Sequence, residues 1–234
     1  MKIKAAFLCA LGCVLVHAAI CQGFVQNDFG KTVKVFDADG KSFVNPYIDF
    51  EGSPFFISEW KYGKLKLSNQ TEFTNVQFRL NLLSQQVHYL YNNVEMVVTA
   101  GLVKEVTLYD TSRKGIFTYH FACGFPPVDN KTEKNFFLIL CEGKVRLLES
   151  EYKKDVVETD ALSGEVKKEF KEYDEYYVFA DNKMQLVKRD KAFLLGVLQD
   201  KQAKIEAFVA ANKLSYKSMA DIEQIINYYN SLSL

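Results

Sequence analysis

VRLLESEYKKDVVE-TDALSGE-VKKEFKEYDEYYVF, residues 145–179, is the stretch that decides the fold. Two long segments rich in β-branched and aromatic residues flank a short polar turn that contains Gly164, which is the pattern of a β-hairpin. Lysine and glutamate are interleaved along both segments, so cross-strand ion pairs can form, each worth about 0.2–1 kcal/mol. We therefore expect a charged hairpin over 145–179 that projects into water.

Upstream of the hairpin, short segments with strand character recur between turns rich in Gly, Asn and Asp, such as DADG (37–40) and YNN (91–93). Within residues 76–82, Val, Phe and Leu alternate with Gln, Arg and Asn, as in a strand with one buried face. The run FFLILC (136–141) is apolar throughout and is expected to be a central strand. The fold class is therefore mainly β: an antiparallel sheet, a sandwich or a partial barrel.

Residues 190–234 have a helical pattern and are expected to form two to three short helices. Asp200 is expected to cap the second helix, and Ser218 with Asp221 resembles a capping box for the third. Helices this short need tertiary burial, so they should pack on the sheet or on one another. The expected buried faces are Phe193, Leu194, Val197 and Leu198; Ile205, Phe208 and Val209; and Ile222, Ile225, Ile226 and Tyr229.

The start of the chain has the features of a secretory signal peptide, because two lysines precede the apolar run AAFLCALGCVLVHAA. The run is shorter than the ~20 apolar residues of a membrane span. Cleavage after Cys21 and cleavage after Gly23 fit equally well, and we assign the signal to residues 1–21. A lipoprotein is the alternative, although the residue before Cys21 is the bulky Ile20.

The rest of the chain divides into an antiparallel β domain (22–189) and the helical segment (190–234). Removal of the signal takes away two lysines, which leaves 27 Lys and Arg against 29 Asp and Glu and a formal charge of −2. Because no basic excess remains, nucleic acid is not an expected partner.

No later run is long and apolar enough for a transmembrane span. We expect an exported protein of the periplasm or the extracellular space.

Two cysteines, Cys123 and Cys141, remain after the signal, and an exported compartment permits a disulfide between them. They flank a predicted hairpin, so the register of its two strands decides whether the two sulfurs are close enough to bond. If Cys123 faces Phe136, then Cys141 faces Thr118 and the sulfurs are too far apart to bond. A register centred on Thr132 would bring them together, and the sequence leaves both registers open.

No catalytic or cofactor motif is present: the chain lacks HExxH, GxSxG, a glycine-rich phosphate loop and paired CxxC motifs. His88 and His120 lie on predicted strands with no spacing that demands a metal site, so neither a metal nor a cofactor is expected. The sequence therefore favours a binding protein over an enzyme.

Three functions are consistent with these features. The first is a non-enzymatic interaction module that binds a partner through the charged hairpin or the helical tail. The second is a cup for a small apolar or glycan ligand, suggested by the 14% aromatic content. The third is a hydrolase whose site is assembled from dispersed residues. The candidate interaction surface consists of Lys153, Lys154, Lys167, Lys168, Glu169 and Tyr173.

Several segments together resemble exported β-rich proteins of Bacteroidetes-type bacteria that have a short helical tail. These segments are WKYGKLKLSNQTEFTNVQFRLNLLSQQVHYL (60–90), CEGKVRLLES (141–150), YYVFADNKMQLVKRDKAFLLGVLQDKQAKIEAFV (176–209) and NYYNSL (227–232). The resemblance lies in the sequences of the predicted strands and turns, over most of the chain, and includes no catalytic signature. It implies a location in a bacterial envelope, and it assigns no activity and no functional residue.

Overall fold

The computed structural model describes residues 35–37, 42–43, 47, 49–98, 101–112 and 115–232. The expected signal peptide and its cleavage positions lie outside these residues, as does most of the DADG turn. Within the described chain, no helix has the length and apolar character needed to cross a membrane.

The described strands form a single open sheet in the order β12-β11-β10-β9-β8-β7-β3-β4-β5-β6-β1-β2. Neighbours from β12 to β6 pair antiparallel, and β1 adds to β6 in parallel. This confirms the mainly β fold with antiparallel pairing. The strands are β1 (Val35–Asp37), β2 (Ser42–Phe43), β3 (Lys61–Leu67), β4 (Glu72–Asn81), β5 (Gln86–Tyr91), β6 (Val94–Val97), β7 (Val103–Ser112), β8 (Gly115–Ala122), β9 (Phe137–Cys141), β10 (Arg146–Thr159), β11 (Val166–Ala180) and β12 (Lys183–Leu186).

The strands form where apolar and polar residues alternate in the sequence. The turns form at residues that tolerate a positive φ. In β4, Phe78 and Leu80 are buried, and Arg79 between them faces the other side of the sheet. Asn92 and Asn93 (φ 50° and 62°) connect β5 to β6, as the YNN sequence predicts. The predicted apolar strand is β9, which pairs with β8 on one side and β10 on the other, so it is internal to the sheet.

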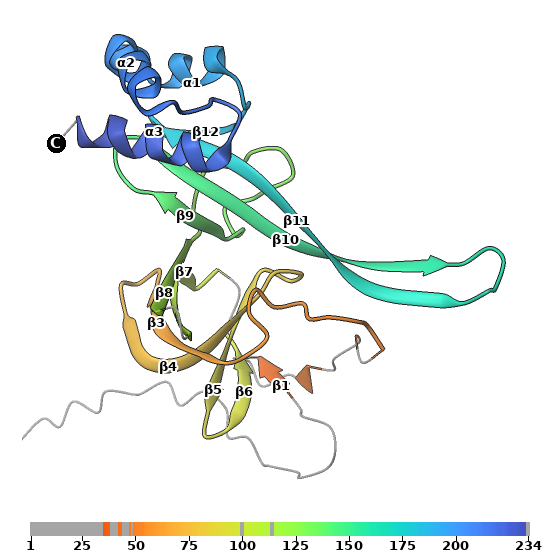
Figure 1. Ribbon diagram of the computed structural model, residues 1–234. Coiled ribbons are helices and arrows are strands. Elements are labelled where there is room, and N and C mark those ends of the chain that lie inside the picture. Colours follow the sequence, from red (N-terminus) through yellow and green to blue (C-terminus); the bar gives the residue numbers. More distant parts are fainter. Residues whose placement is uncertain are drawn as a thin grey trace, which may run out of the picture.

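Helices α1 (Lys191–Val197), α2 (Gln202–Asn212) and α3 (Met219–Ser231) lie together over the inner part of the β10–β11 hairpin (Figure 1). Residues Leu147 and Val178 of the hairpin pack in one core with the apolar faces of the helices. The opposite face of the same strands carries Leu148 and Tyr177, which pack against Phe125 and Phe137. The inner hairpin is therefore covered on both faces.

Of the two helix caps predicted from the sequence, one is present in the structure. Ser218 caps α3, because its Oγ accepts a hydrogen bond from Asp221 N (3.3 Å). The predicted face of α3, from Ile222 to Tyr229, is buried. Asp200 does not cap α2: it lies in a short 3-10 turn and instead accepts a hydrogen bond from the Tyr229 hydroxyl (2.9 Å). The prediction for Asp200 was wrong because a tertiary hydrogen bond competes for the same carboxylate.

Asn230 at the end of α3 anchors the helical segment to the sheet. Its Nδ2 donates to Glu142 O (3.0 Å) and Val145 O (2.7 Å), and its Oδ1 accepts from Val145 N (3.0 Å). Asn230 is 9% exposed. Gly143 has φ +140° and lies against this amide, so that a Cβ there would be 2.5 Å from Asn230 Cγ. The turn between β9 and β10 therefore needs glycine at this position.

Both cysteines in the described part of the chain are free thiols. The register of β8 and β9 pairs Ala122 with Phe137, which places Cys123 opposite Phe136. This is the register that separates the two sulfurs, so the disulfide considered from the sequence is not formed. Burial raises the pKa of Cys123 to about 11 and that of Cys141 to about 12, so both remain protonated at neutral pH.

Candidate functional site

The β10–β11 hairpin is the most prominent feature of the molecule, and its far end stands clear of the rest of the chain (Figure 1). Strand pairing runs without interruption from Arg146↔Phe179 to Thr159↔Val166. Only the inner end is extended into the sheet, where β9 pairs with Leu147–Glu149 and β12 with Tyr177–Ala180. We call residues 156–169 the outer hairpin.

A segment before β3 holds the middle of the hairpin. Lys153 Nζ donates to the carbonyl oxygens of Ser53 (3.0 Å) and Phe55 (2.9 Å) and forms an ion pair with Glu172 (3.2 Å). Its side chain is only 11% exposed. Hydrogen bonds to a charged donor each contribute about 1.5–3 kcal/mol, so this lysine fastens the hairpin to the body.

The same segment also pairs with the free edge of β11. Glu51 N donates to Lys168 O (2.9 Å), and Phe170 N donates to Glu51 O (3.3 Å). The ring of Phe170 packs against Tyr47 and Phe50, with centroids 5.4 and 5.2 Å away. These contacts reach Lys168, so they hold the base of the outer hairpin and leave its tip unsupported.

One face of the hairpin has a stacked aromatic pair, Tyr152 and Tyr173, with ring centroids 5.4 Å apart. Lys154 lies over Tyr173 (5.1 Å), and Lys131 lies over Tyr152 (4.1 Å) from the loop that follows β8. Lys131 also pairs with Glu175 (2.8 Å). Burial alone would raise the pKa of Glu175, but the hydrogen bond and charge of Lys131 outweigh it and lower that pKa.

The opposite face of the hairpin carries a cluster of carboxylates, which includes Glu149, Glu151 and Glu172. Burial, together with the charges of Glu149 and Glu172, raises the pKa of Glu151 to about 7. Glu151 is opposite Asp174 in the register, and Glu149 is opposite Tyr176. Among the described residues, no group of acidic, histidine or cysteine side chains is arranged to hold a metal ion.

The tip of the hairpin is a rigid turn with an exposed apolar side chain. Asp160 Oδ1 accepts hydrogen bonds from Leu162 N (2.9 Å), Ser163 N (2.7 Å) and Ser163 Oγ (2.9 Å). Leu162 is 99% exposed, and Val157 and Val166 are 57% and 53% exposed. Exposed apolar residues on such a preorganised turn are suited to contact with another molecule.

The structure divides the predicted interaction surface between the two faces of the hairpin. Because directly opposite residues share a face, Lys154, Lys167, Glu169 and Tyr173 lie on the aromatic face, whereas Lys153 and Lys168 lie on the other. Lys153 does not belong to an exposed surface, because its ammonium is used within the fold. The sequence did not identify Leu162, although an apolar residue inside a polar turn was a visible signal.

Both histidines on the predicted strands lie beside carboxylates, and His120 Nε2 is 3.5 Å from Glu105 Oε2. His88 is 1% exposed, and its Nδ1 lies 2.6 Å from Glu95 Oε1, which Arg79 also contacts at 2.6 Å. Burial would raise the pKa of Glu95, but the His88 hydrogen bond and the Arg79 charge lower it overall. The Arg79 guanidinium lies between the rings of Phe55 (3.9 Å) and Trp60 (4.0 Å). This cluster joins β4, β5 and β6 to the segment before β3.

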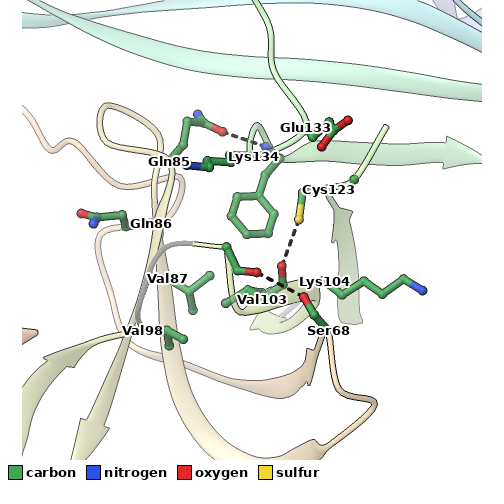
Figure 2. Close-up of a pocket in the computed structure, with 13 residues that line it drawn as sticks. Ser68, Gln85, Gln86, Val87, Val98, Val103, Lys104, Cys123, Glu133 and Lys134 are labelled. Carbon is green, nitrogen blue, oxygen red and sulfur yellow. Dashed lines mark hydrogen bonds between the residues drawn. The ribbon is translucent and has the colours of Figure 1, made fainter. Parts of the chain in front are cut away.

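A pocket of about 520 Å³ lies in the body of the sheet, between β5, the start of β7 and the loop after β8. Figure 2 shows Val87, Val98 and Val103 on one side of it, with the Cys123 thiol directed towards Val103. The volume falls within the range of about 300–1,000 Å³ that is usual for small-molecule sites.

Comparison of the chain with protein family models, with characterised proteins and with solved structures finds no match. The protein is therefore described by its structure alone: it is an open, mainly antiparallel sheet with a projecting hairpin and a helical segment packed on the sheet.

Proposed function

We propose that this chain is an exported protein of a bacterial envelope that binds a partner protein through the outer hairpin. The single observation that carries the proposal is the exposed tip: Leu162 is 99% exposed on a turn held by three hydrogen bonds to Asp160. Export is supported by the basic and apolar start of the chain.

The tip has the composition of a small protein-binding surface. Leu162, Val157 and Val166 supply apolar contacts, and the charged residues around them supply a polar rim. Protein interfaces concentrate their binding energy in a few central residues that become fully desolvated. Since Asp160 already holds the turn, little conformational entropy is lost when the tip docks.

The test is site-specific photo-cross-linking in cells that produce the full chain. A photoreactive amino acid replaces Leu162 or Val166 in the tip, and Lys204, which is exposed on α2, serves as the matched control position. The expected result is one common partner adduct from both tip positions and none from Lys204. Equal yields of that adduct from Lys204 and the tip would refute the proposal.

A trimmed protein provides the competition control. Replacement of Thr159–Val166 by Asn-Gly closes the turn at the hydrogen-bonded pair Glu158↔Lys167 and keeps the contacts of Lys153, Glu51 and Phe170. When the cross-linking is repeated in an extract of these cells, purified wild-type protein in excess should suppress the adduct, whereas the trimmed protein should not. Equal suppression by both proteins would place the binding surface elsewhere.

A second candidate function is the binding of a small apolar or glycan ligand in the pocket. The observation that favours it is the volume of about 520 Å³ together with an apolar lining formed by Val87, Val98, Val103 and Phe136. A dispersed hydrolase site has no comparable support, because neither His88 nor His120 lines this pocket.

A further inference from the structure

The interior of the pocket is apolar. Val87, Val103 and Phe136 line it and are 1%, 6% and 5% exposed. Cys123 adds a thiol whose pKa is raised to about 11 by burial, so it contributes a neutral surface at physiological pH. Such a lining favours the entry of hydrocarbon and disfavours the entry of charge.

Two polar side chains of the inner wall, Gln85 and Cys123, already have partners within the protein. Gln85 Oε1 accepts from Phe136 N (2.9 Å), and Gln85 Nε2 donates to Leu82 O (3.0 Å). The Cys123 thiol donates to Val103 O (3.0 Å), and the Ser68 hydroxyl, which is exposed at the edge of the pocket, donates to Gly101 O (3.2 Å). A sugar or another polar ligand would lose hydrogen bonds to water here without recovering them from this wall.

The rim of the pocket has an excess of positive charge. Of the residues that line the pocket, Lys104 and Lys134 are exposed at the rim, against one acid, Glu133. The charge of Glu105 also reaches Cys123. The described residues offer neither lysine an ion pair. Figure 2 shows the Lys104 ammonium directed outwards, but an exposed lysine changes rotamer on a picosecond to nanosecond timescale and can turn towards a ligand.

We propose that this pocket binds an amphipathic carboxylate, a molecule with a hydrocarbon body and one carboxylate head. The body lies against Val87, Val103 and Phe136, and the head lies at the rim between Lys104 and Lys134. The inference rests on the second proposed function, ligand binding, and adds the charge and polarity of the ligand.

The test is titration calorimetry of the full chain with three probes that share one tail: decanoate, decanol and decyltrimethylammonium. Decanoate should bind most tightly, decanol more weakly, and the cation least. In the variant Lys104→Glu/Lys134→Glu, decanoate affinity should fall about tenfold and decanol affinity should stay the same. The matched control, Lys204→Glu/Lys217→Glu, makes the same charge change at exposed positions of the helical segment and should bind decanoate like the wild type.

A second measurement locates the bound probe. Cys123 lines the pocket, whereas Cys141 packs beneath the helices. Decanoate should slow alkylation of Cys123, read by peptide mass mapping, and leave alkylation of Cys141 unchanged.

The outcomes separate the two proposals. If decanol and decanoate bind equally and charge reversal changes neither, the pocket binds ligands but the inference of an anionic head is wrong. If no probe binds, or if Cys123 is not protected, both the inference and the binding of an apolar ligand in this pocket are refuted.

Discussion

The substitution Asn230→Ala tests how the helical segment is attached to the sheet. It removes three hydrogen bonds, to Glu142 O and to the N–H and C=O of Val145, at a site that is 9% exposed. A neutral hydrogen bond contributes about 0.5–1.5 kcal/mol, and the Val145 N–H would be left buried without a partner. We expect the free energy of unfolding to fall by about 3 kcal/mol.

The assay is urea unfolding followed by far-UV circular dichroism, with Asn227→Ala as the control. Asn227 lies on the exposed side of the same helix, so its substitution should change stability by less than about 0.5 kcal/mol. If Asn230→Ala were as stable as the control, water would be replacing the amide and the anchoring role would be refuted.

Gly143 provides a coupled test of the same contact. Gly143→Ala should destabilise the protein, because its φ is +140° and the new Cβ would lie 2.5 Å from Asn230 Cγ. In the double variant the clash is removed, so the loss should be smaller than the sum of the two single losses. Strict additivity would contradict the contact.

Three further predictions concern the hairpin and the thiols. Lys153→Met keeps the apolar stem but loses the hydrogen bonds to two carbonyl oxygens, so it should lower the free energy of urea unfolding by about 3 kcal/mol or more. A loss of under about 0.5 kcal/mol would contradict the role of Lys153 in fastening the hairpin. The pKa of Glu151 is raised from 4.5 to about 7, so the folded state holds a proton that the unfolded state releases; stability should fall as pH rises through this window, and Glu151→Gln should flatten that dependence. Non-reducing peptide maps should show no link between Cys123 and Cys141, and both thiols should react with iodoacetamide much faster in urea than in buffer at neutral pH.

Much of the fold could be predicted because its signals are local. The alternation in β4, the unbroken apolar run of β9 and the periodic face of α3 each lie within a short window of sequence. Asn92–Asn93 marks its turn because asparagine tolerates positive φ. These elements required no knowledge of the rest of the chain.

The candidate sites were less accessible from the sequence. The hairpin was identified, but its lysines were treated as one surface, whereas the strand register places Lys153 and Lys154 on opposite faces. The pocket residues Lys104 and Lys134 carried no signal, because they lie on separate segments that only the folded sheet brings to one rim.

The sequence by itself determined the strands, the long hairpin and the buried face of the last helix, because side-chain periodicity and turn chemistry act over a few residues. The tertiary structure decided which polar side chains hold distant segments together by hydrogen bonds. Asn230 finds its partner 85 residues away, and Lys153 finds its partners 98 and 100 residues away. A buried polar group must have a hydrogen-bond partner. Whether a given polar residue is buried depends on how distant segments pack, and no local sequence pattern encodes that packing.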